Sequence, residues 1–212
     1  MTSPGAKTAA RDVCHLEWFI NSRCDYTCKG CIPEAPASDK PDLPLEACLE
    51  ALESYAAFAA ERKAETRITF YPRQAEFTKP FTAVLEAVRT MKSKGLIHQV
   101  TCANRGDLPG DKIKLYRDGG VDTCRLTIDG PAHVQDVLRR EGSSRDTLKA
   151  FREARGSGIQ VLPLTILVKY NAPHLTDTLK LLMDEDFEHC RVQAGIRGDA
   201  GGANAKAGDH PD

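Results

Sequence analysis

The chain has 212 residues, 41% of them hydrophobic, which is enough for one domain with a core that folds without disulfides. Its 29 Lys+Arg and 30 Asp+Glu residues nearly cancel, so no overall charge favours nucleic acid or an anionic membrane, and we predict neither as a partner. No apolar stretch is long enough to span a bilayer, and residues 1–12 lack the apolar segment of a secretion signal. We therefore expect a cytoplasmic protein with reduced thiols.

Short apolar runs alternate along the chain with longer amphipathic segments, which is typical of β/α units. In chain order we expect a strand at 16–21, a helix from Pro44 to Ala59, a strand at 67–71, a helix at 81–91, a strand at 99–103, a short helix before Gly119, a strand at 123–128, a Ser-capped helix ending at Gly156, a strand at 161–168, a helix at 175–183 and a strand at 190–193.

Strands joined through helices form parallel sheets with right-handed crossovers, and six such units fit the length. The predicted fold class is therefore α/β, a partial (β/α)6 barrel over residues 14–196 that carries its chemistry at the carboxyl ends of the strands. We expect residues 1–13 to be a flexible N-terminus. Residues 197–212 are rich in Gly, Ala and Asp and are predicted to be a flexible tail.

Three of the eight cysteines lie within eight residues, directly after the first predicted strand. Cys24, Cys28 and Cys31 have the spacing C-x3-C-x2-C. A loop with this spacing brings three thiolates to one iron–sulfur cube and leaves the fourth iron open, as a catalytic cluster requires. Zinc with His15 as fourth ligand is an alternative, because soft ligands serve either metal. The five other cysteines are scattered along the chain: Cys14, Cys48, Cys102, Cys124 and Cys190. Cys102 and Cys124 lie on predicted strands and are expected in the core, while a role of Cys190 as a hydrogen donor facing the site is an alternative to packing.

The triplet resembles the signature of the radical S-adenosylmethionine (SAM) superfamily, and later segments resemble that family in the expected order. They are Thr101-Cys-Ala-Asn104-Arg-Gly, Leu126-Thr127-Ile-Asp129-Gly130-Pro131, Asp136-Val-Leu-Arg139 with Gly142-Ser143, and Gly158-Ile-Gln-Val161. The resemblance spans about residues 16–193 and is strongest to the branch of peptide maturases and the molybdenum-cofactor cyclase. Larger peptide maturases carry a cysteine-rich C-terminal region for auxiliary clusters. Here Cys190 is the only cysteine after Cys124, so we expect no auxiliary cluster.

Two positions depart from the family pattern. Gly30 stands where the family usually has an aromatic residue before the last cysteine. The turn after the second strand reads Pro72-Arg-Gln74-Ala in place of the family's Gly-Gly-Glu-Pro, so Gln74 offers a neutral acceptor where a carboxylate usually contacts the SAM amino group.

The resemblance implies the cofactors and the residues that hold them. A [4Fe-4S] cluster would be held by Cys24, Cys28 and Cys31, and SAM would be contacted by Gln74, Asn104, Thr127 and Arg139. Arg139 is expected on the SAM carboxylate, because a guanidinium matches a carboxylate bidentately. Its alternative is a solvated arginine at a charged helix start. Asn104, Thr127 and Asp129 have structural alternatives as turn formers.

By the same resemblance, the expected activity is reductive cleavage of SAM to a 5′-deoxyadenosyl radical, which abstracts hydrogen from a peptide or small-metabolite substrate, as in natural-product biosynthesis. The expected electron donor is a flavodoxin or a ferredoxin. Two alternatives stay open. One is an activase that installs a glycyl radical on a partner enzyme. The other is a non-catalytic iron–sulfur or zinc-binding subunit, which the altered turn at Gln74 favours.

Overall fold

A computed structural model describes residues 12–20, 28, 43–72 and 79–194. The described residues form a six-stranded sheet in which every neighbouring pair is parallel and the strand order follows the chain. The strands are β1 (Val13–Phe19), β2 (Glu65–Tyr71), β3 (Gln99–Asn104), β4 (Thr123–Thr127), β5 (Gln160–Leu167) and β6 (Arg191–Ala194). The expected strands and their parallel arrangement are confirmed. Consecutive parallel strands place their carboxyl ends at one edge of the sheet.

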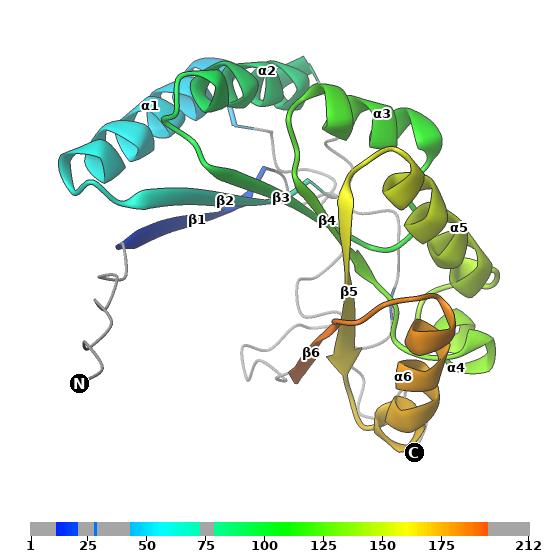
Figure 1. Ribbon diagram of the computed structural model, residues 1–212. Coiled ribbons are helices and arrows are strands. Elements are labelled where there is room, and N and C mark those ends of the chain that lie inside the picture. The colour runs from blue at the N-terminus through cyan, green and yellow to red at the C-terminus, as the bar shows by residue number, and fades with distance from the viewer. Residues whose placement is uncertain (1–11, 21–27, 29–42, 73–78, 195–212) are drawn as a thin grey trace, which may run out of the picture.

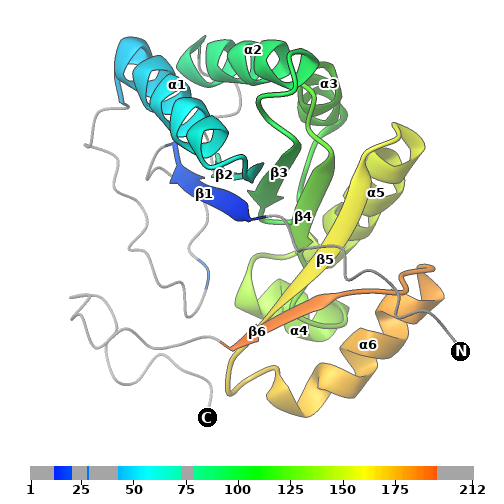
Figure 2. The same cartoon turned by 60° about the vertical axis from the view of Figure 1, so that its left-hand side comes forward.

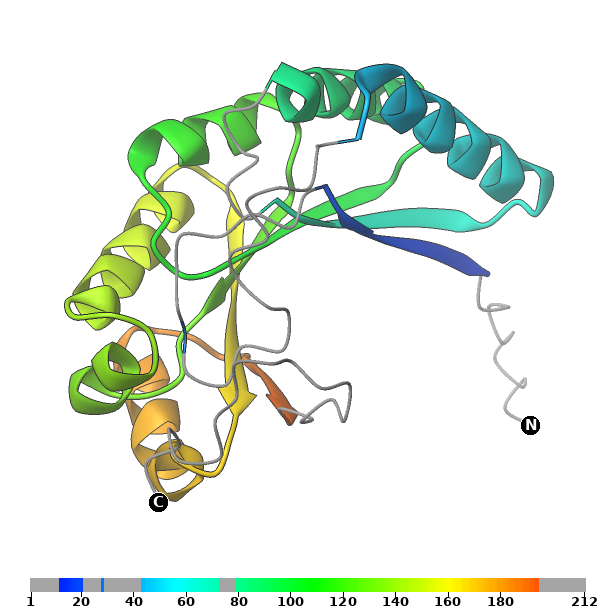
Figure 3. The same cartoon turned by 180° about the vertical axis from the view of Figure 1, so that it is seen from behind.

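Figure 1 shows the sheet curled, with the helices along its convex side and a concave side that they leave uncovered. The helices are α1 (Leu45–Glu61), α2 (Lys79–Ser93), α3 (Gly110–Asp118), α4 (Ala132–Leu138), α5 (Ser143–Gly156) and α6 (Leu175–Asp184), with a 3-10 turn, η2, at Ala172–His174. The view from behind shows β1 and β6 at the two ends of the curl, so the sheet is a half-barrel (Figure 3). None of the helices within the described ranges is both long and apolar enough to cross a membrane.

The alternation of side chains along each strand produces this layering. On β4, Cys124 and Leu126 are fully buried in the core that packs under the helices, as is Cys102 on β3. Burial raises the pKa of the Cys124 thiol to about 12, so it behaves as an apolar core residue. The expectation that these two strand cysteines are packing residues is confirmed.

The start of α5 differs from the sequence prediction. Ser143 is the first helical residue rather than the cap, and Gly142 precedes it with φ +76°. The carboxylate of Asp136 on α4 accepts hydrogen bonds from the backbone N–H groups of Gly142 (2.9 Å) and Ser144 (2.8 Å). An acidic side chain from the preceding helix thus replaces the expected serine cap and satisfies two free N–H groups. Figure 2 shows α4 and α5 next to each other at the β4 and β5 side of the sheet.

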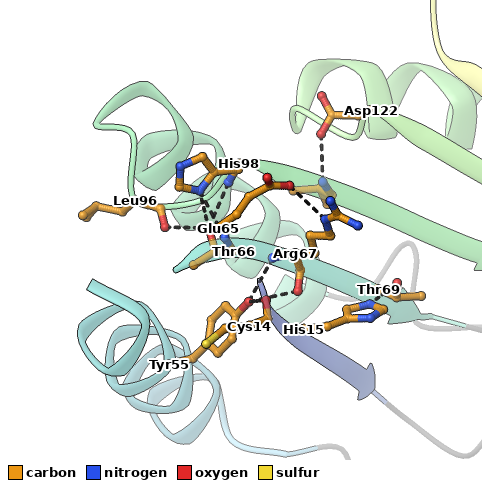
Figure 4. Close-up of polar contacts among 11 residues, drawn as sticks. Cys14, His15, Tyr55, Glu65, Thr66, Arg67, Thr69, Leu96, His98 and Asp122 are labelled. Carbon is orange, nitrogen blue, oxygen red and sulfur yellow. Dashed lines mark hydrogen bonds and ion pairs between the residues drawn. The ribbon is translucent and has the colours of Figure 1, made fainter. Parts of the chain in front are cut away.

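The amino ends of the first three strands are held by polar contacts (Figure 4). The Tyr55 hydroxyl on α1 donates to the backbone carbonyl of Cys14 at 2.7 Å, and burial raises the pKa of Tyr55 to about 12. Thr66 Oγ1 lies 2.7 Å from Nδ1 of His98 and donates to the carbonyl of Leu96. In β/α folds this end of the sheet serves stability. Cys14 therefore lies at the edge opposite to the carboxyl ends of the strands.

Candidate functional site

A buried ion pair closes the carboxyl end of β4. Asp129 follows the strand, and its Oδ2 lies 2.6 Å from Nη2 and 2.8 Å from Nε of Arg139, which ends α4. The two side chains are only 5% and 11% exposed. The other carboxylate oxygen of Asp129 accepts the backbone N–H of Ile166 on β5 at 2.8 Å. The pair thus fixes Arg139 relative to two neighbouring strands.

Two buried amide side chains support this pair. Gln135 Oε1 accepts the Asp129 backbone N–H at 2.7 Å, and its Nε2 donates to Ser143 Oγ at 3.0 Å. Asn171 Nδ2 donates to the backbone carbonyls of Asp129 (2.9 Å) and Ile166 (3.0 Å). Neither amide was predicted from the sequence. For Gln135 the available signal was its position three residues before Leu138, on a helix whose Val134 and Leu138 are buried.

Arg139 joins this network to the cysteine triplet. Its Nη1, the guanidinium nitrogen that does not contact Asp129, lies 3.6 Å from Sγ of Cys28. Burial alone would lower the pKa of Arg139, but the negative charges of Asp129 and of a Cys28 thiolate outweigh it, and the net shift is upward. Arg139 is therefore a buried cation. The alternative of a solvated arginine at a helix start is wrong.

The environment of Cys28 suits a metal ligand. A cysteine binds iron as a thiolate, and a neighbouring guanidinium stabilises that charged form. Cys24, Cys31 and Gln74 lie outside the described residues, so within the described ranges no three candidate ligands gather. His15 lies on β1, four residues before its end, and its Nε2 is 2.9 Å from Thr69 Oγ1 (Figure 4). Four strand residues span roughly 13 Å, which does not favour zinc binding by His15 together with the triplet.

Asn104 and Thr127 meet at the ends of β3 and β4. Thr127 Oγ1 donates to the backbone carbonyl of Asn104 at 3.0 Å, and Asn104 Oδ1 accepts from the Tyr116 hydroxyl at 3.1 Å. The Asn104 Nδ2 atom is buried and has no hydrogen-bond partner in the part of the chain that the structure describes. A buried amide donor without an acceptor costs about 1–3 kcal/mol. This atom fits a ligand that brings an acceptor, such as a SAM hydroxyl or carboxylate.

The chain matches a known protein family over most of its length. The model of the radical SAM superfamily matches residues 18–182, a span that includes the triplet, the turn after β3 and the Asp129–Arg139 pair. The chain belongs to the radical SAM superfamily. Members of this family use a [4Fe-4S] cluster and SAM, so the expected fold, family and cofactors are confirmed at the level of the family.

Individual relatives are distant. The AdoMet-dependent heme synthase of Oleidesulfovibrio alaskensis is 23% identical over 192 residues, which cover 85% of this chain and 45% of the relative. The solved structure of native anSMEcpe with bound AdoMet and Cp18Cys peptide has a TM-score of 0.71 at 15% identity, covering 87% of this chain and 51% of that one. Methylornithine synthase (PylB) has a TM-score of 0.68 at 14% identity, covering 88% and 54%. The chain spans about half the length of these proteins.

Gly106 lets the turn after β3 pack closely against the end of β4 and against α5. Its φ is +119°, and a Cβ built there would lie 2.5 Å from the backbone carbonyl oxygen of Thr127 and in direct overlap with Thr147 Oγ1. Because backbone cannot move away as a side chain can, we predict that Gly106→Ala lowers the free energy of unfolding by about 2–4 kcal/mol. Urea unfolding followed by circular dichroism measures this loss.

Two glycines serve as controls for Gly106→Ala. Gly95 also has positive φ, +71°, but a Cβ there meets nothing within 4 Å, so Gly95→Ala should cost about 1 kcal/mol from backbone conformation alone. Gly156 lies at the end of α5 with open space around it, and Gly156→Ala should be neutral or slightly stabilising. A Gly106→Ala loss no larger than that of Gly95→Ala would contradict the close approach to Thr127.

Proposed function

We propose that this chain is a radical SAM enzyme that cleaves SAM reductively and modifies a peptide or small-metabolite substrate by hydrogen abstraction. The observation that carries the proposal is the contact of Arg139 with Cys28, which sets a member of the cysteine triplet next to a buried cation at the carboxyl end of β4. In β/α folds, ligands and chemistry gather at this edge. The family match supports the same assignment.

We propose Cys24, Cys28 and Cys31 as the ligands of the [4Fe-4S] cluster. A cluster held there would supply the electron for reductive cleavage of SAM to methionine and a 5′-deoxyadenosyl radical. The described residues act around it. Arg139 donates to Cys28 Sγ and so lowers the electron density on that sulfur, while Asp129 keeps the guanidinium in place.

Four residues are proposed as SAM contacts. Asn104 has a free amide donor, and Thr127 lies beside it, as described above. The Nε–H and one N–H of Nη2 of Arg139 point to Asp129, so we propose that Arg139 reaches the SAM carboxylate through its remaining N–H groups, chiefly those of Nη1. Gln74 is proposed as an acceptor for the SAM ammonium.

The substrate class is proposed from the resemblance to peptide maturases and from the distant likeness to anSMEcpe, whose solved structure contains a bound peptide. Natural-product biosynthesis is the proposed setting, with a flavodoxin or ferredoxin as electron donor. None of the described residues gives specific support to a glycyl-radical activase. We propose that residues 14–196 form the radical SAM domain.

We predict that Asn104→Ala weakens SAM binding about five- to tenfold, because the loss of one donor to a bound ligand costs about 1–1.5 kcal/mol. Tyr116→Phe is the matched control: it removes the hydrogen bond to Asn104 Oδ1 and leaves Nδ2 in place.

Gln74→Glu should leave SAM affinity unchanged or raise it, since it adds a charge opposite the ammonium. Titration of SAM into the reduced, reconstituted protein, read by electron paramagnetic resonance, measures all three.

Equal losses of SAM affinity in Asn104→Ala and Tyr116→Phe would assign Asn104 a purely structural role. Abolished SAM binding in Gln74→Glu would show that the altered turn at Pro72 serves another purpose, and the assignment of Gln74 would be wrong.

A further inference from the structure

Arg125 lies at the middle of β4, on the side of the sheet away from the helices. Its neighbours Cys124 and Leu126 face the core, so alternation turns Arg125 to the concave face. A contact confirms this direction: Arg125 Nη1 lies 3.5 Å from the Tyr71 hydroxyl on β2. Because β3 lies between β2 and β4, this contact spans the hollow of the curled sheet.

The guanidinium of Arg125 is buried without a counter-charge. The residue is 8% exposed, and its Nε is buried with no hydrogen-bond partner in the part of the chain that the structure describes. Another buried guanidinium, that of Arg139, contacts a carboxylate at 2.6 Å. Buried charges in proteins are as a rule paired, because an isolated one costs several kcal/mol of desolvation. Arg125 therefore has the donors and the charge for an anion that the described residues do not supply.

Tyr71 links Arg125 to the carboxylate of Glu17. The Tyr71 hydroxyl donates to Glu17 Oε1 at 3.2 Å, which leaves its oxygen as the acceptor for Arg125. Burial, and then the charge of Glu17, raise the pKa of Tyr71, so the phenol keeps its proton and this polarity at neutral pH. Glu17 is exposed on the first strand and does not contact the guanidinium. Tyr71 thus orients Arg125 without neutralising it.

The strand positions next to Arg125 are apolar. Ala103 on β3 and Leu162 on β5 are its register partners, and both are half-buried. These two apolar neighbours lower the local dielectric constant, which strengthens the attraction of the guanidinium for an anion. Arg125 lies two residues before Thr127, roughly 7 Å along the strand from the edge where SAM is proposed to bind.

We propose that Arg125 binds a carboxylate of the substrate on the concave face of the half-barrel. This inference rests on the proposed function, because it names the chemical class of the molecule on which the radical acts. The guanidinium offers Nε and a terminal nitrogen to the two carboxylate oxygens. The substrate class is therefore a carboxylic acid. Its carboxylate would lie beside Arg125, two residues before Thr127 along β4 and away from the carboxyl end where SAM is proposed to bind.

The first test is the stability of the reconstituted protein. Removing an uncompensated buried charge should stabilise the ligand-free protein, so Arg125→Met should raise the Tm by roughly 2–5 °C. Arg67→Met is the matched control: Arg67 is 44% exposed and paired with Glu65, and its replacement should change the Tm by less than about 1 °C. A lower Tm for Arg125→Met would show that the guanidinium already has a partner, and would overturn the inference.

The second test uses propanoate as a minimal carboxylate. Propanoate is compared with chloride at the same ionic strength. It should raise the Tm of the wild-type and Arg67→Met proteins by about 2–4 °C and leave the Tm of Arg125→Met unchanged. Equal shifts in all three proteins would overturn the site. An equal response of the wild type to inorganic phosphate would overturn the choice of a carboxylate.

Methionine distinguishes the substrate from SAM. If saturating methionine abolishes the propanoate shift, Arg125 binds the SAM carboxylate and the assignment to substrate is wrong; an undiminished shift supports it. The formation of 5′-deoxyadenosine by the wild type is measured separately. A wild type that forms 5′-deoxyadenosine but shows no propanoate shift overturns this inference and leaves the proposed function standing. A shift without 5′-deoxyadenosine supports the anion site while the proposed function fails.

Discussion

Replacing Cys28 by Ala should reduce bound iron from about four atoms per chain to nearly none, and the same holds for Cys24 and Cys31. Three thiolates hold three of the four irons of such a cluster, so the loss of one leaves two ligands and an unstable cube. Formation of 5′-deoxyadenosine should fall to background in each variant. Iron and acid-labile sulfide, measured after anaerobic reconstitution, check this prediction.

The core cysteines provide the control. Cys124→Ala and Cys48→Ala remove buried thiols that the structure places in the core under the helices, so iron content should stay near four. A comparable loss of iron in either control would reveal a ligand outside the triplet. Stoichiometric zinc without sulfide in the wild type would reject the iron–sulfur assignment.

Replacing Asp129 by Ala should lower the free energy of unfolding by about 3–5 kcal/mol, the usual cost of leaving one member of a buried ion pair unpaired. The variant leaves Arg139 charged and buried, and it deprives the Ile166 backbone N–H of its acceptor. Asp129→Asn should cost less, because an amide oxygen can still accept from Ile166. Urea unfolding of the iron-free protein measures the difference without interference from the cluster.

Asp146→Ala is the matched control for Asp129→Ala. Asp146 pairs with Arg140 at 2.7 Å, but Arg140 is 42% exposed, and such pairs contribute about 0–1 kcal/mol. A double variant, Asp129→Ala with Arg139→Met, should recover much of the stability lost in Asp129→Ala, because no unpaired charge remains. Equal losses for Asp129→Ala and Asp146→Ala would contradict the account of the buried pair.

The sheet was predictable because each strand alternates or is continuously apolar and each helix keeps its own spacing. These are local properties, and Leu126 or Phe81 shows its core role within its own segment. The cap of α5 was not predictable in this way. Asp136 satisfies N–H groups six and eight residues later, across a turn whose path the local sequence does not specify.

The candidate site could also be predicted only in part. The spacing of Cys24, Cys28 and Cys31 was recognisable in the sequence, and so was the resemblance of the segments around Asp129 and Arg139 to the family. The pairing of Asp129 with Arg139 could not be predicted without the fold, because nine residues, including helix α4, lie between them. Arg125 carried no signal at all. Only the curl of the sheet shows that a strand arginine is buried on the concave face without a carboxylate.

The most direct test of the central claim is the formation of 5′-deoxyadenosine from SAM. Protein reconstituted with iron and sulfide, reduced with dithionite and supplied with SAM, should release 5′-deoxyadenosine and methionine in equal amounts, quantified by liquid chromatography with mass spectrometry. We expect this product with the wild type and none with Cys28→Ala. A wild type that carries a full [4Fe-4S] cluster and binds SAM, yet forms no 5′-deoxyadenosine above the Cys28→Ala background, would contradict the proposal that this chain is a radical SAM enzyme.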